Sequence, residues 1–100
     1  VAPMAEERQA HAVAVLDGKL YAVGGFNGDD EDSLSSVERY DPATNAWEGV
    51  AQMAAARTLA AVAVLDGKLY AVGGHNRVNG HNRLSSVERY DPVTNAWEAA

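Results

Sequence analysis

The sequence contains no cysteine, and this absence removes several chemistries at once. Disulfide bonds, thiolate metal ligands and thiol nucleophiles are all excluded. A protein from a reducing compartment and an engineered sequence both fit a cysteine-free chain.

Positive charge is also scarce. Lysine and arginine number 8 against 14 aspartate and glutamate residues, which gives a formal net charge of −6. No basic stripe with interleaved aromatic residues occurs, so we do not expect a nucleic-acid partner. The acidic excess is expected to favour solubility.

Long apolar runs are missing as well. No stretch approaches the roughly 20 residues that span a bilayer, and the N-terminus lacks the pattern of a secretory signal. We therefore expect a soluble chain without a membrane partner; its location is open, and is cytoplasmic if the chain is natural or recombinantly expressed. Val1 is not a native start, so a removed leader and a trimmed chain both remain open.

The chain consists of two similar halves. Hydrophobic residues make up 47% of the 100 residues and charged residues 22%, as in an ordered globular domain. The period is about 50 residues, and we divide the chain into units 1–49 and 50–100. Three segments recur letter for letter: residues 12–25 as 61–74, 34–42 as 84–92, and 44–48 as 94–98.

Differences between the units gather in two places. Residues 3–11 differ from 52–60, and residues 26–33 differ from 75–83. A shared scaffold with distinct loops is expected when structure is fixed and surface presentation varies. Near-identity elsewhere indicates a consensus-built or duplicated design.

Each unit is predicted to be a four-stranded meander. In the first unit the strands are expected at residues 12–16, 20–23 and 36–40, with a fourth beginning at residues 46–47. Asp17-Gly18 is a signal for a type I′ hairpin, and Asn45 suits a left-handed turn position. Glu38 and Arg39 point to opposite faces, so cross-strand ion pairing or solvation is expected rather than a catalytic pair.

The first two strands of a unit are apolar on both faces, which requires cover on both sides. Radial stacking of small sheets provides this, with inner strands near a central axis and bulky Tyr40 and Trp47 in the wider outer gap.

A spaced glycine and aromatic pattern resembles the kelch motif. The double glycine, tyrosine and tryptophan of each unit carry it: Gly24, Gly25, Tyr40 and Trp47, then Gly73, Gly74, Tyr90 and Trp97. The resemblance covers the whole chain twice and implies an all-β fold. Its architecture would be kelch-type β-propeller blades, two four-stranded antiparallel blades per chain, with six blades usual in a ring.

Two blades would leave apolar sheet faces exposed, because each repeat buries its faces only against its neighbours. Identical chains with two blades each close a ring with an even number of blades. The six-bladed expectation therefore predicts a cyclic, head-to-tail homotrimer, and a tetramer with eight blades stays open.

Metal and cofactor sites receive little support. The glycine pairs lack the helix and lysine of a phosphate loop, so backbone geometry is their expected role. His75 and His81 match no standard ligand spacing, although three-fold symmetry would gather three copies of each. The acidic run 28–32 lacks the alternating ligands of a calcium loop. We expect no cofactor.

The resemblance also implies a ligand-binding face on the ring. In kelch adaptors the matching positions grip acidic peptides, and arginine suits carboxylate recognition. Acidic residues around this face of the first unit weaken that preference. The matching positions are Arg8, Phe26, Asn27, Ser36, Arg57, His75, Asn76, Arg77 and Ser86.

The leading hypothesis is therefore an engineered, self-assembling kelch subunit that serves as a structural and binding scaffold without catalysis. The alternative is a fragment of a natural kelch adaptor that binds a protein or peptide segment, as ubiquitin-ligase substrate receptors do. An enzyme is the third class, since some kelch-like propellers carry oxidase or epimerase chemistry. The oxidase type needs a cysteine cross-link that this chain lacks.

Overall fold

The computed structural model describes residues 2–4, 8, 11–25, 33–76 and 82–100. These residues form ten β-strands and no helix, which confirms the all-β prediction. The first sheet has the order β1-β2-β3-β4, and all its neighbours are antiparallel. Its strands are β1 (Ala12–Leu16), β2 (Lys19–Val23), β3 (Val37–Asp41) and β4 (Ala46–Val50).

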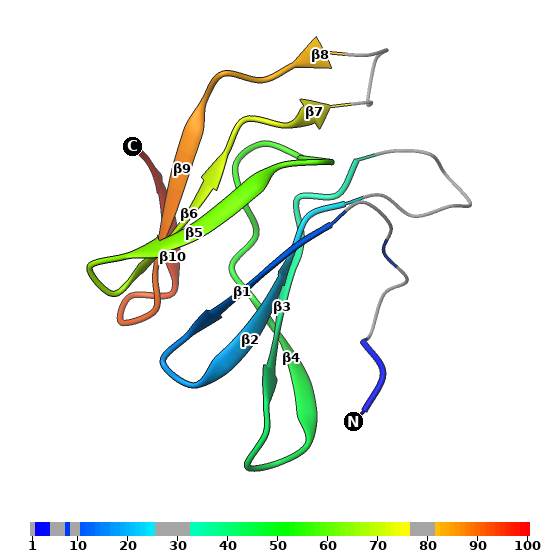
Figure 1. The fold of residues 1–100 in the computed structure, drawn as a ribbon, viewed down its shortest axis with the longest axis vertical. Coiled ribbons are helices and arrows are strands. Elements are labelled where there is room, and N and C mark those ends of the chain that lie inside the picture. The colour runs from blue at the N-terminus through cyan, green and yellow to red at the C-terminus, as the bar shows by residue number, and fades with distance from the viewer. Residues whose placement is uncertain (1, 5–7, 9–10, 26–32, 77–81) are drawn as a thin grey trace.

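The second sheet repeats this meander in the order β5-β6-β9-β10. A short additional pair, β7 with β8, extends beyond the ends of β6 and β9 (Figure 1). The strands are β5 (Ala61–Leu65), β6 (Lys68–Val72), β7 (His75–Asn76), β8 (Asn82–Arg83), β9 (Val87–Asp91) and β10 (Ala96–Ala99).

The turns form as their residues predict. Asp17 has φ 52° and Gly18 has φ 73°, the two positive values of a type I′ hairpin. Asn45 has φ 53°, the left-handed region that asparagine tolerates. Strand β1 has the predicted bounds, whereas β2 begins one residue early, and β3 begins and ends one residue late. Strand β4 runs through Val50, one residue past the predicted division of the chain.

The double glycine after β2 lets the linker between the sheets, residues 51–60, pass close to its own backbone. Gly24 has φ 64°, and a Cβ built there would lie 2.3 Å from the carbonyl oxygen of Arg57. The next amide, that of Gly25, donates a hydrogen bond to the same oxygen at 2.7 Å. Close approach and positive φ, rather than phosphate binding, account for this pair.

Each sheet has two faces, which we name by the strand register. Face A of the first sheet carries Ala14, Leu16, Tyr21, Val23 and Val37, and in the second sheet Ala63, Leu65, Tyr70, Val72 and Val87. Face B of the first sheet carries Val13, Val15, Leu20, Tyr40 and Trp47, and in the second sheet Val62, Val64, Leu69, Tyr90 and Trp97.

The hydrophobic core lies between the sheets, with face A of the first against face B of the second. Strands β1 and β5 are neighbours at this junction, and Figure 1 shows the two sheets fanned out from them. The rings of Tyr21 and Tyr90 meet across it with centroids 5.8 Å apart. Leu16, Leu69 and Met53 of the linker complete the buried cluster. Burial of one such leucine is worth about 1.5–3 kcal/mol.

Candidate functional site

Arg57 lies at the centre of a buried polar cluster in the second sheet. Its guanidinium donates to the Glu88 carboxylate at 2.9 Å and to the backbone oxygens of Gly73 and Ser86, both at 2.9 Å. A further bond reaches the Ser86 hydroxyl at 3.1 Å. Only 1% of the Arg57 side chain is exposed, so the ion pair is almost fully desolvated.

The first sheet repeats this cluster with equivalent residues. Arg8 donates to Glu38 at 3.1 Å, to the Gly24 oxygen at 2.8 Å and to the Ser36 oxygen at 2.9 Å. Its side chain is buried as completely as that of Arg57. Each arginine thus ties the start of a unit to the double glycine and to the first residues of the third strand.

These clusters change the interpretation of four predicted ligand-binding residues. Arg8 and Arg57 direct their guanidinium groups inward onto carboxylates of the same chain, and Ser36 and Ser86 accept bonds from them. In this geometry the arginines hold separate segments of the same chain together. Contact with a ligand stays a prediction for this set, and it would require the arginines to leave partners they already hold.

The glutamate of each cluster was expected to be solvated or paired across strands. Glu38 is instead buried against Arg8, which lies 30 residues earlier in the chain. The neighbouring Arg39 does form the expected cross-strand ion pair, with Glu48 on β4. Hydrogen bonds to Tyr21 and then to Glu48 raise the pKa of Arg39 above its ordinary value.

A second set of hydrogen bonds joins the outer strand of each sheet to the segment that precedes that sheet in the chain. The side-chain oxygen of Asn95 accepts the amide of Ala51 at 3.0 Å and the hydroxyl of Tyr90 at 2.8 Å. The indole of Trp97 then donates to the oxygen of Ala51 at 2.8 Å. This clasp was not predicted from the sequence, although the repeated TNAWE segment places asparagine and tryptophan two residues apart.

The clasp recurs in the first unit. Ala2 donates its amide to Asn45 at 3.0 Å and accepts the indole of Trp47 at 2.7 Å. Ala2 therefore has the same contacts on the first sheet that Ala51 has on the second.

The remaining predicted site residues belong to the loops. His75 and Asn76 form β7, and both are half-buried. The backbone of His75 also pairs with Thr58 of the linker, through hydrogen bonds of 2.7 and 2.8 Å. Phe26, Asn27, Arg77 and His81 lie outside the described residues. Over the part of the chain that is described, no three histidine or carboxylate side chains gather as metal ligands would.

Face B of the first sheet and face A of the second sheet do not meet another sheet within the described residues. Leu16 and Leu65 occupy the same position on face A, yet they are 3% and 60% exposed. Val23 and Val72 differ in the same way, at 1% and 43%. Because the strands are identical in sequence, the neighbouring sheet and the linker that carries Met53 account for the difference. The requirement for cover on both sides is therefore met on only one side of each sheet within the chain.

Comparison with known protein families matches the kelch motif to the chain twice, over residues 7–54 and 56–100. The chain belongs to the kelch-repeat family. Each matched segment contains one four-stranded sheet, so the two sheets are kelch β-propeller blades.

Relatives in this family are much longer than the chain. Kelch-like protein 35 of Mus musculus is 49% identical over 51 residues, which is 51% of this chain and 8% of that protein. An F-box/kelch-repeat protein of Arabidopsis thaliana is 48% identical over 42 residues, or 42% of the chain and 11% of that protein. The matched part of the chain thus spans about a tenth of the length of these relatives.

A solved structure shows the same fold. The structure of YjhT superimposes with a TM-score of 0.81 and covers 93% of this chain, which corresponds to 37% of YjhT. The sequences are 21% identical, so the likeness concerns the fold alone. In the described part of the chain no helix has the length and apolar character needed to cross a bilayer.

Proposed function

We propose that this kelch chain is a non-catalytic scaffold subunit, which completes a six-bladed ring as a head-to-tail trimer and displays its two different loop sets for binding. One observation carries the proposal: identical residues are buried on one blade and exposed on the other. Leu65 and Val72 lie open where their counterparts Leu16 and Val23 form the core. Covering these side chains would release free energy of the kind that holds the two blades together.

The letter-for-letter repeats support a consensus-built or duplicated origin for this subunit. They also mean that any copy of the chain carries both surfaces needed at a blade junction. A closed ring satisfies every face, whereas an open chain of copies leaves two faces exposed at its ends.

Light scattering across a range of protein concentrations tests the proposal. The expected result is one species with three times the mass of the chain. A four-chain species would keep the ring and correct its blade number to eight. A single-chain mass at all concentrations would refute the ring.

A second candidate function is recognition of a protein segment on the ring face, as in kelch adaptors. It is favoured by the β7–β8 pair, which carries His75 and Asn76 beyond the second blade (Figure 1). Binding of immobilised acidic and neutral peptides would test it, with the His75→Ala/Asn76→Ala variant as the comparison. Equal binding by this variant would remove these residues from the recognition face.

A further inference from the structure

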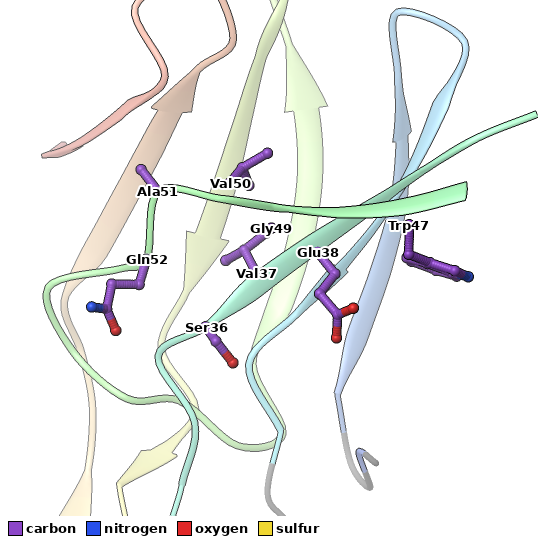
Figure 2. Close-up of a pocket in the computed structure, with 8 residues that line it drawn as sticks. All are labelled: Ser36, Val37, Glu38, Trp47, Gly49, Val50, Ala51 and Gln52. Carbon is purple, nitrogen blue, oxygen red and sulfur yellow. The ribbon is translucent and has the colours of Figure 1, made fainter. Parts of the chain in front are cut away.

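The outer strands of the first blade carry a groove beside Trp47. The groove has a volume of about 740 Å³ and lies on the two outer strands, β3 and β4. Trp47 and Glu38 project from these neighbouring strands, as Figure 2 shows. The lining residues are Ser36, Val37, Glu38, Trp47, Gly49, Val50, Ala51 and Gln52.

The equivalent part of the second blade is occupied. There Trp97 packs against the core cluster, together with Val50 of the first blade. Val37 and Met53 are buried in the same cluster, at 1% and 3% exposure. Within the chain no blade precedes the first one, so the surface beside Trp47 lacks the cover that the first blade gives Trp97.

The open surfaces continue inward from this groove. On face B, Val13 and Val15 of β1 are exposed. On face A of the second blade, Leu65 and Val72 are exposed in turn. The two open surfaces lie on opposite ends of the blade pair, and each is the counterpart of one half of the buried junction.

We infer that a second copy of the chain docks in one direction only: face A of its second blade covers face B of the first blade. This inference names the docking surface of the proposed ring and rests on that proposal. Tyr70 of one copy would then meet Tyr40 of the next, in the arrangement that Tyr21 and Tyr90 have within the chain at 5.8 Å. Val87 of the docking copy would join Trp47 in a buried cluster, as Val37 and Trp97 share one within the chain.

A second copy is the occupant because the sequence that forms the buried face A within the chain is repeated on the open blade. Strands β5 and β6 are identical to β1 and β2, and β9 is identical to β3. Docking of face A onto face A has no counterpart among the described residues. A contact between unlike faces closes a ring when its repeated rotation completes a full turn.

Two single variants test the direction of docking. Val15→Asp blocks face B and Leu65→Asp blocks face A, at residues that are 63% and 60% exposed, so neither substitution disturbs the core of its own chain. Each variant alone should lose the three-chain species and run as a single chain. An equimolar mixture should form a two-chain species, because one intact junction remains and cannot extend.

Matched variants distinguish this docking surface from a contact elsewhere on the blades. Val93→Asp changes a residue that is 90% exposed in the turn before β10 and should keep the mass of the unmodified chain. A chain carrying both Val15→Asp and Leu65→Asp should not associate in any mixture. Self-association of Val15→Asp alone would show that like faces meet, and a three-chain mass for both single variants would place the contact elsewhere. The first result would overturn the head-to-tail ring as well, because like faces cannot repeat around a trimer, whereas the second would overturn only the docking surface.

Cross-linking reads out the same surface even if the unmodified chain is mostly single. The chain has no cysteine of its own, so Tyr40→Cys on one copy and Tyr70→Cys on another can be joined by a short bis-maleimide. The doubly substituted Tyr21→Cys/Tyr90→Cys chain is the positive control, because those rings already meet. Efficient bridging in the control with none between copies would refute the docking surface.

Discussion

Asn95 and Tyr90 share one hydrogen bond, 2.8 Å long, that closes the turn between β9 and β10. The same side-chain oxygen of Asn95 accepts the amide of Ala51 from the linker, at 3.0 Å. Asn95 has φ 52°, so it satisfies the turn and joins the two blades at once.

Substitutions of Asn95 should separate the role of its left-handed backbone from the role of its side-chain oxygen. Asn95→Gly keeps the left-handed backbone but removes the acceptor, and we expect a loss of about 1–2 kcal/mol in the free energy of unfolding. Asn95→Asp keeps the acceptor and should stay close to the unmodified chain. Urea unfolding measures both, and equal losses for the two variants would contradict a role for the side-chain oxygen.

The buried and exposed glutamates of the second blade provide a second comparison. Glu88 accepts the amides of Ala54 and Ala55, at 2.7 and 3.2 Å, in addition to Arg57. Glu88→Ala would leave a buried guanidinium without its counterion, and we expect a loss of about 3–5 kcal/mol. Glu98→Ala removes an exposed partner of Arg89 and should change little. Similar effects of the two variants in denaturant unfolding would argue against a desolvated cluster.

Two glycine substitutions should have opposite consequences. Gly24→Ala meets the Arg57 oxygen at 2.3 Å and a positive φ, so we expect a loss of about 2 kcal/mol or more. Gly49→Ala has open space, and the second blade carries Ala99 at the equivalent position. A gain of about 0.5–1 kcal/mol is expected there. Thermal unfolding of the two variants checks the pair, and a stable Gly24→Ala chain would contradict the close linker approach.

Stability should fall in alkaline solution because of Tyr90. Burial raises the pKa of Tyr90 above its ordinary value. The unfolded chain therefore releases this proton first, from about pH 10, and the free energy of unfolding decreases as the pH rises further. Tyr90→Phe should make this decrease shallower, as judged from denaturant curves at several pH values. A slope unchanged by the substitution would rule out the tyrosine as its source.

Local features of the fold were predictable from the sequence. Asp17-Gly18 and Asn45 specify turns through backbone geometry that few residues adopt, and the strands between them follow from side-chain alternation. The glycine pair has the positive φ and the close backbone approach that glycine, without a Cβ, permits.

Contacts that depend on the direction in which a side chain points were not predictable from the sequence. The sequence places Arg57 in a linker but does not reveal that its side chain turns inward to Glu88, 31 residues later. Glu38 lies between Val37 and the charged Arg39, and its own charge suggested exposure or pairing across strands. Strand β7 was missed because His75 and Asn76 are polar and show no period. Which copy of an identical leucine is buried depends on which blade stands beside it.

The linker of residues 51–60 follows β4 of the first blade and makes the clasp and the arginine cluster of the second blade. No single division of the sequence into units therefore keeps all the contacts of a blade within one unit. A tandem duplication of one full period reproduces every contact, whichever residue it begins from. Unequal recombination within such a gene can lengthen or shorten the array by whole blades, and no new interface has to arise for the product to fold.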